Sequence, residues 1–208
     1  MISTNRPFRS LIVLAAIAMP ALADPAIAQS GFGTRLTAGV LGGATFPRGA
    51  FDDEVGYGWH AGAFGKIRLY GPLDGRIDGA YAKFGKKELV ATGGALTTEA
   101  YVTFGTASVS INLGADSAAY PGDNTVSPYL LGGLGRYSLD FEAECIQGTC
   151  GTIPEVKTFW GVNVGGGATV PLAGIRTFVE GRYHRISRAE VEGGARVMVL
   201  LSVGVKFR

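Results

Sequence analysis

The final fourteen residues of the chain, A-R-V-M-V-L-L-S-V-G-V-K-F-R, alternate with a strict two-residue period. One phase of this period is wholly apolar and consists of Val197, Val199, Leu201, Val203, Val205 and Phe207. The other phase mixes apolar and small residues with the cations Arg196, Lys206 and Arg208. Because successive side chains of a β-strand point to opposite faces, the pattern predicts a long terminal strand. Its apolar face must lie against a protein core or against lipid.

The N-terminus has the three parts of a secretory signal peptide. The first nine residues carry two arginines and no acid, residues 11–19 are apolar, and the small-x-small pattern Ala21-Leu22-Ala23 follows. The apolar run is much shorter than the ~20 residues that a membrane-spanning helix needs. We therefore expect cleavage after Ala23, and a second small-x-small pattern makes Ala28 the alternative site.

The composition of the remaining chain indicates a single all-β domain. Removal of the signal peptide would leave 17 basic and 17 acidic residues, and a nearly neutral chain argues against nucleic acid as a partner. Glycine accounts for 33 of the 208 residues, more than double the ~7% average. No segment has the composition of a long helix, so we predict one all-β domain over residues 31–208.

The two cysteines, Cys145 and Cys150, lie close together in the polar stretch E-A-E-C-I-Q-G-T-C-G-T. In an exported protein, such a pair is typical of a disulfide that closes a small loop. A metal site would need further ligands, and His60 and His184 are far away in the sequence. We therefore expect a disulfide between the two cysteines. The glycine run 165–167 falls inside a predicted strand and not in a phosphate-binding turn, so we expect no cofactor.

Two-residue alternation recurs along the whole domain and predicts eight strands: 35–46, 57–70, 76–85, 98–113, 127–141, 156–170, 175–187 and 195–208. Most of them have the length that a tilted membrane strand requires, about 9 to 11 residues or more. Short turns between strands alternate with longer polar loops, which is typical of outer-membrane barrels. The fold class that we predict is an eight-stranded antiparallel up-and-down transmembrane β-barrel.

Periodicity alone leaves open which face points outward, because a soluble barrel of lipocalin type would place its apolar face inside, around a ligand. Two features favour lipid on the apolar face. Aromatic residues of the apolar phase gather near the longer loops and predict an interfacial girdle: Phe46, Tyr57, Trp59, Tyr81, Tyr101, Phe141, Trp160 and Tyr183. The other phase carries charges of both signs, which a narrow lumen tolerates if they are paired: Lys66, Arg68, Arg76, Asp78, Arg136, Glu180 and Arg182.

Only two charges of the apolar phase lie outside the turns, namely Lys83 and Arg185. Both fall near the loop-side ends of their strands, where lipid phosphate groups would lie. We therefore expect these two side chains to contact lipid phosphates.

Three segments are similar to a known family: 128–135 (P-Y-L-L-G-G-L-G), 178–183 (F-V-E-G-R-Y) and 203–207 (V-G-V-K-F). They resemble the small eight-stranded outer-membrane barrels of OmpA-like and opacity-protein type, often labelled porin-family proteins. The resemblance implies a Gram-negative outer-membrane location, with extracellular loops and periplasmic termini. It also implies insertion by the outer-membrane assembly machinery, with Phe207 as the assembly signal, although Arg208 follows that residue here.

An enzymatic function has to be considered, because lipid A deacylases of the outer membrane use a barrel of this size. They place a His and a Ser two residues apart, whereas His184 and Ser187 are three residues apart. On a strand that spacing places the two side chains on opposite faces, out of reach of each other. We expect no enzymatic activity.

The lumen charges leave two further interpretations, a narrow channel for small solutes or a paired plug. Eight strands leave little room for water inside, which favours the plug. We therefore expect a structural or surface-interaction barrel. Its partners would be outer-membrane lipid, lipopolysaccharide, the assembly machinery and an unknown surface ligand.

Overall fold

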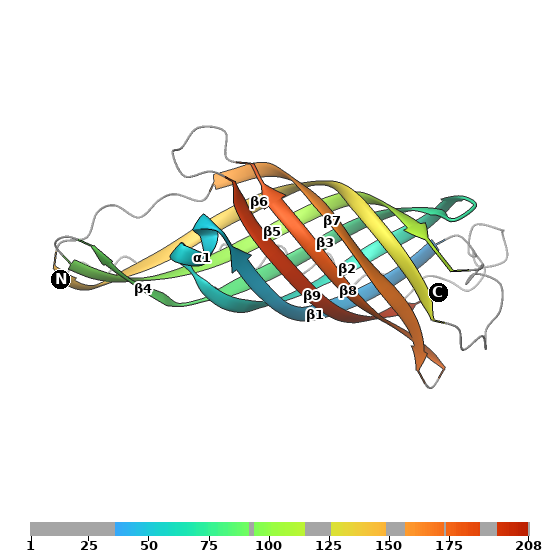
Figure 1. Ribbon diagram of the computed structural model, residues 1–208, viewed down its shortest axis with the longest axis horizontal. Helices are drawn as coiled ribbons and strands as arrows, with labels where there is room; N and C mark the ends of the chain where they lie inside the picture. The colour runs from blue at the N-terminus through green and yellow to red at the C-terminus, as the bar shows by residue number, and fades with distance from the viewer. Residues whose placement is uncertain are drawn as a thin grey trace, which may run out of the picture. The chain divides into compact units, whose positions relative to one another are not determined.

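The computed structural model describes residues 36–91, 94–114, 126–148, 157–172, 174–187 and 195–207. These residues form one antiparallel sheet that closes into a barrel (Figure 1). Nine strands and one short helix make up the described chain: β1 (Leu36–Arg48), α1 (Ala50–Glu54), β2 (Gly56–Tyr70), β3 (Leu73–Gly85), β4 (Lys87–Ala91), β5 (Gly94–Asn112), β6 (Ser127–Gly148), β7 (Lys157–Leu172), β8 (Ile175–Ile186) and β9 (Arg196–Phe207). No helix among these elements is long and apolar enough to span a membrane.

Eight of the strands form the closed barrel, which confirms the predicted fold class. Among these eight strands each pairs with the following one, with β3 paired directly with β5, and β9 pairs with β1 to close the sheet. The short strand β4 stands apart from the closed wall, because it pairs with β5 beyond the point where β3 ends.

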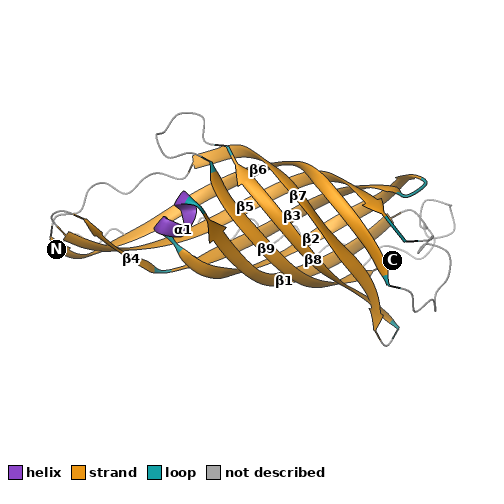
Figure 2. Ribbon diagram, viewed as in Figure 1, coloured by secondary structure: helices purple, strands orange, loops and turns teal. Residues whose placement is uncertain are grey.

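The two ends of the barrel differ (Figure 2). At one end, which we call the helix end, α1 connects β1 to β2 and the β4–β5 hairpin extends away from the wall. At the other end, the turn end, tight turns connect β2 to β3 and β7 to β8. Gly71 and Gly174 lie in these turns with φ angles of 53° and 81°, in the left-handed region that glycine adopts without strain.

Two segments predicted as loops contain strand. Residues 86–96 include β4 and the start of β5, and β6 continues to Gly148, through Cys145. In both segments the backbone continues to pair as antiparallel strands beyond the barrel wall. The sequence did not predict these strands, because the segments are too polar to show an apolar phase. The predicted disulfide lies outside the described residues, since Cys150 is not described and Cys145 is described by its backbone alone. The predicted signal peptide and its cleavage sites also lie outside them.

The apolar phase points outward on seven of the eight barrel strands, where it leaves large hydrophobic side chains exposed. On β9, for example, Leu201, Val203 and Phe207 are 52%, 62% and 56% exposed. In a globular protein such an exterior would be unstable in water, whereas in a bilayer it faces an apolar solvent.

On β6 the facing that the sequence predicted was wrong. Tyr129, Leu131 and Tyr137 point into the barrel and are buried, while Leu130 and Leu134 are exposed outside. On this strand the inward phase is the more apolar one, because Tyr137 and Leu139 pack inside the barrel. The outward phase carries the exposed charges Arg136 and Asp140. The rule that the more apolar phase faces lipid therefore fails here. Arg136 therefore lies on the outer face of the barrel, and Phe141 packs inside it.

Close contact between β1 and β9 closes the barrel and depends on Gly43. A Cβ atom added at Gly43 would overlap the backbone carbonyl oxygen of Leu201 on β9. We expect Gly43→Ala to destabilise the folded barrel by about 1–3 kcal/mol, because overpacking here must move backbone and not a flexible side chain. Urea unfolding in lipid vesicles, followed by gel mobility without boiling, measures this effect.

Gly79→Ala is the matched control, because a Cβ atom at Gly79 meets nothing within 4 Å. We expect this variant to unfold at the same urea concentration as the wild type. Equal stability of both glycine variants would contradict the close packing of β1 against β9.

Candidate functional site in the barrel lumen

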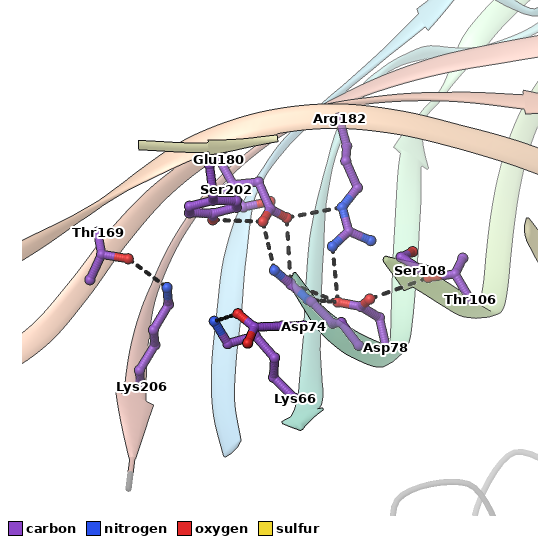
Figure 3. Close-up of polar contacts among 12 residues, drawn as sticks. Lys66, Asp74, Asp78, Thr106, Ser108, Thr169, Glu180, Arg182, Ser202 and Lys206 are labelled. Carbon is purple, nitrogen blue, oxygen red and sulfur yellow. Dashed lines mark hydrogen bonds and ion pairs between the residues drawn. The ribbon is translucent and has the colours of Figure 1, made fainter. Parts of the chain in front are cut away.

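Four buried charges form the centre of the lumen. Arg76 donates a hydrogen bond from Nη1 to Glu180 Oε2 at 2.7 Å and one from Nε to Asp78 Oδ1 at 2.8 Å. Arg182 Nη2 donates to Asp78 Oδ1 at 3.1 Å. Arg182 Nε lies 3.0 Å from Glu180 Oε1, as an ion pair without a hydrogen bond. These two arginines and two acids, which we call the charge quartet, balance in formal charge. Figure 3 shows Asp78, Glu180 and Arg182 of the quartet with their contacts.

The strand order explains how the charge quartet forms. Arg76 and Asp78 are two residues apart on β3, and Glu180 and Arg182 are two residues apart on β8, so each pair shares one face of its strand. β3 and β8 lie four strands apart around the eight-stranded wall and therefore face each other across the lumen. The quartet thus spans the barrel from wall to wall.

Neighbouring side chains hold the charge quartet in place. Tyr129 donates its hydroxyl proton to Glu180 Oε2 at 2.7 Å, and Thr106 donates to Asp78 Oδ2 at 3.3 Å. The guanidinium of Arg76 lies 4.0 Å from the ring centroid of Phe64, within cation–π range. Most lone pairs and protons of the quartet are thereby satisfied, which a buried ion pair requires to be stable.

A second group of charges lies between the charge quartet and the turn end. Asp74 Oδ2 accepts hydrogen bonds from Lys66 Nζ at 2.6 Å and from Asn112 Nδ2 at 2.7 Å, and Arg68 Nε lies 3.6 Å from Asp74 Oδ1. On the other side, Lys206 donates to Thr169 Oγ1 at 2.6 Å (Figure 3). Cations outnumber acids in this group, so the turn-end part of the lumen is electropositive.

Neutral polar side chains lie on the helix-end side of the charge quartet. His60 bonds through Nδ1 to Thr45 Oγ1 at 3.1 Å and through Nε2 to Ser202 Oγ at 2.8 Å. His184 is fully buried, and its Nδ1 lies 2.8 Å from the Tyr137 hydroxyl oxygen. Both imidazoles therefore serve as internal hydrogen-bonding groups between strands.

An apolar cluster lies in the lumen beyond these histidines, toward the helix end. Its buried members are Phe51, Val55, Ala82, Phe84, Ala100, Val102, Phe104, Tyr137, Leu139, Ile186, Met198 and Leu200. Phe51 and Val55, from α1 and the residue after it, are 0% exposed and insert into the cluster from the mouth of the barrel. The charged groups and the apolar cluster therefore form two layers of side chains in the lumen, with the neutral polar side chains between them.

The helix α1 is fixed to the wall by one strong ion pair. Arg196 of β9 donates from Nε and Nη2 to the carboxylate of Glu54 at 2.8 Å each. Its guanidinium also lies 4.6 Å from the ring centroid of Phe141 and 5.7 Å from that of Phe51. Such a bidentate pair adds fixed geometry to its charge. The pair consequently holds α1 against β9 at this end of the barrel.

Sequence and structure agree on most, but not all, of the side chains predicted to form the site. The structure brings together six of the seven predicted lumen charges, in the two charged groups described above: Lys66, Arg68, Arg76, Asp78, Glu180 and Arg182. Arg136, the seventh, is exposed on the outer face because β6 has the opposite facing. Assigning it to the lumen was wrong.

Seven of the eight predicted girdle aromatics point outward near the helix end. Three ring contacts run along this belt: Phe46–Tyr57 at 5.5 Å, Trp59–Tyr81 at 5.9 Å and Tyr81–Tyr101 at 6.2 Å. Trp160 and Tyr183 are 67% and 41% exposed. Phe141 instead packs inside, 6.4 Å from Phe51, so its assignment to the girdle was wrong for the same reason as that of Arg136.

The two residues expected to meet lipid phosphates also point outward. Lys83 pairs with Glu99 at 3.0 Å, and its ammonium lies 5.3 Å from the Tyr101 ring centroid. Arg185 is exposed on β8. Phe207, the expected assembly signal, is exposed at the end of β9, on the lipid-facing phase.

Several lumen residues were missed by sequence reasoning. Asp74 shares the phase of Arg76 and Asp78, but it was assigned to a turn; its phase was the signal that could have identified it. Glu54 and Phe51 lie in a short acidic segment without periodicity, so nothing in the sequence distinguished them. Arg196 was recognised only as a polar residue of the last strand.

The site offers little for chemistry beyond hydrogen bonding. His184 points into the lumen, whereas Ser187 is exposed, and its backbone N–H donates to Trp160 O at 2.9 Å. Within the described ranges, no three His, Cys, Asp or Glu side chains come close enough to hold a metal ion.

A closed eight-stranded antiparallel barrel with an apolar exterior and buried charges inside defines the class of small outer-membrane barrels. The chain belongs to the family of the outer membrane protein β-barrel domain, whose model matches residues 10–207. This family places the protein in the Gram-negative outer membrane. No curated protein sequence matches the chain.

Solved structures of similar fold come from several Gram-negative bacteria. Neisserial surface protein A is 17% identical, with 83% of this chain and 96% of that chain covered and a TM-score of 0.50. OprG of Pseudomonas aeruginosa is 11% identical, with 83% and 96% covered and a TM-score of 0.48. Ail of Yersinia pestis is 12% identical, with 83% and 97% covered and a TM-score of 0.40. At these identities the likeness concerns the fold alone.

Proposed function

We propose that the protein is a non-enzymatic outer-membrane barrel with a closed lumen, which acts through its surface as a structural or interaction module. The observation that supports this proposal is that two groups of side chains contact one another across the lumen. The charge quartet spans the barrel from β3 to β8, and the apolar cluster with Phe51 fills the helix-end half. A barrel filled in this way has its exterior and its loops available for function.

In this proposal the helix end faces outward from the cell and the chain termini lie in the periplasm. Tight turns at the opposite end are typical of periplasmic connections. The partners would be outer-membrane lipid and lipopolysaccharide, an unidentified surface ligand at the helix end, and the assembly machinery, which would engage the strand that ends at Phe207.

A narrow channel for small solutes is the second candidate, favoured by the charged groups in the turn-end half of the lumen. Water and ions entering from that side would meet Lys66, Arg68 and Lys206 and then the charge quartet. The apolar cluster beyond the quartet opposes passage, because ions pass an apolar constriction only where it is hydrated.

Two observations argue against a soluble carrier and against a lipid-modifying enzyme. The large exposed hydrophobic side chains of the barrel exterior disfavour a soluble carrier of lipocalin type. The burial of His184, with Ser187 on the other face, disfavours a lipid A deacylase, since the base must reach the nucleophile within ~3 Å.

Gel mobility and conductance test the proposal together. We expect the outer-membrane fraction to contain a form that migrates differently before and after boiling, because a closed barrel survives cold detergent. In planar bilayers the same preparation is expected to give no stable single-channel steps, because the lumen is filled. Steady conductance from the shifted form would establish the channel instead. An unshifted protein in the periplasmic fraction would overturn the membrane assignment.

A further inference from the structure

The cations on the barrel exterior are unevenly distributed between its two ends. Among the described residues of the barrel wall that face outward, the basic ones are Arg48, Lys83, Arg136 and Arg185, and all of them lie in the helix-end parts of their strands. The outward positions near the turn end are apolar, for example Leu36, Leu69, Ile111 and Phe207. One rim of the lipid-facing surface is thus suited to anions and the other is not.

Two of these cations lie in one lateral row. Arg48 on β1 and Arg185 on β8 are both paired in register with Val197 on β9, which lies between them. Because neighbouring strands are about 4.8 Å apart, the two arginine Cα atoms are about 10 Å apart and their side chains can reach one common group. The row contains no acid, and neither guanidinium forms an ion pair with an acid of the described residues.

The next row toward the middle of the barrel is aromatic and apolar. Phe46 and Tyr183 are both paired with Val199, two residues along each strand from the arginine row. The two rows are about 7 Å apart along the strands. Outward-facing aromatic side chains of a membrane barrel lie at the boundary between acyl chains and polar headgroups. The arginine row therefore lies at the level of the lipid phosphates.

The other outward cations lack this arrangement. Lys83 is already paired with Glu99 at 3.0 Å, in a sector that also contains the exposed acid Glu142. Arg136 on β6 is paired with Gly105 on β5 and with Trp160 on β7, so its neighbours in the row carry no second cation. The pair on either side of Val197 is the arrangement that two-point recognition of one phosphate requires.

We propose that Arg48 and Arg185 bind one phosphate group of an outer-leaflet glycolipid, with its acyl chains against Phe46, Val199 and Tyr183. The proposal rests on the proposed function, in which the helix end faces outward. Guanidinium groups form charge-assisted, often bidentate hydrogen bonds with phosphate oxygens, and two of them can neutralise a doubly charged phosphate. The lipid-facing position excludes part of the water and strengthens the attraction.

Lipid binding to the folded, detergent-solubilised protein tests this site. Native mass spectrometry would follow titration with lipid A that carries its phosphates and with lipid A from which they have been removed. We expect Arg48→Gln with Arg185→Gln to weaken binding of the phosphorylated lipid by about tenfold or more, and each single substitution by a few-fold. Arg136→Gln is the matched control, an exposed outward arginine outside the pair, and its binding is expected to stay within about twofold of the wild type.

The remaining outcomes distinguish a lipid phosphate from a free phosphate ion, and the lipid site from the proposed closed lumen. Equal binding of the double variant and the wild type, or an equal loss for Arg136→Gln, would overturn the site. The same would follow if inorganic phosphate alone displaced the lipid at equal concentration, because the site would then recognise the free ion. Loss of binding in the double variant supports the site even where the wild-type protein conducts ions, an outcome that would overturn only the closed lumen. Gel mobility without boiling confirms that each variant is folded.

Discussion

Replacement of Glu180 by leucine is expected to destabilise the folded barrel by about 3–5 kcal/mol, because it leaves buried positive charge without a partner. Glu180 accepts hydrogen bonds from Arg76 and Tyr129 at 2.7 Å each, and Arg182 lies 3.0 Å away. After the substitution, two guanidinium groups share the single carboxylate of Asp78. Urea unfolding in vesicles, followed by the fluorescence of the outward tryptophans and by gel mobility, measures the loss.

Two controls sharpen this prediction. Glu142→Leu removes an exposed acid from β6, and we expect it to cost less than about 1 kcal/mol. Arg76→Leu combined with Glu180→Leu removes one charge of each sign and keeps the pair of Arg182 and Asp78 at 3.1 Å. We expect this double variant to be more stable than the sum of the two single substitutions predicts, since the residues interact directly. Strict additivity would show that the charge quartet does not act as one unit.

The charge quartet also shows where sequence reasoning ends. Two-residue alternation places Arg76 with Asp78 and Glu180 with Arg182 on the inner phase, because the period of a strand is fixed by its backbone. Their contact across the lumen depends on the number of strands and on the register of each pairing. The sequence indicates the number of strands but leaves the register of their pairing open. Arg76 and Glu180 are 104 residues apart, and no local pattern connects them.

The error on β6 has a specific physical cause. In the helix-end half the interior of the barrel is apolar, and on β6 the inward Tyr137 and Leu139 alternate with the outward Arg136 and Asp140. An apolar phase identifies the lipid face only where the interior is polar, as it is around the charge quartet. The mistakes at Arg136 and Phe141 follow from this one ambiguity.

The two layers of the lumen complement each other energetically. Four buried charges are costly unless each is paired, and their pairing requires strands β3 and β8 to be held at a fixed distance. The apolar cluster supplies that fixed geometry, because close-packed side chains resist changes in the spacing of the wall. The closed lumen that we propose would therefore depend on both layers together, and loss of one layer is expected to weaken the packing of the other.

The second large effect is expected from Phe51→Ala, which should cost about 3–5 kcal/mol by removing a fully buried ring from the apolar cluster. Phe51 packs edge-on against Phe84, with ring centroids 4.8 Å apart, and lies beneath the guanidinium of Arg196. The five-residue helix α1 is too short to be stable by itself, so we expect it to leave the mouth of the barrel when this anchor is lost.

Hydrogen exchange of the α1 backbone and protease cleavage between β1 and β2 measure the release of the helix, and urea unfolding measures the loss of stability. Asp53→Ala is the matched control, because this neighbour of the anchor is exposed on the same helix. Its exchange rate and urea midpoint are expected to equal those of the wild type. If Phe51→Ala left the exchange of α1 unchanged, the bidentate pair of Glu54 and Arg196 would be sufficient to hold the helix. Because the Glu54 carboxylate is partly exposed and screened by water, we expect this pair to contribute less than the fully buried ring of Phe51.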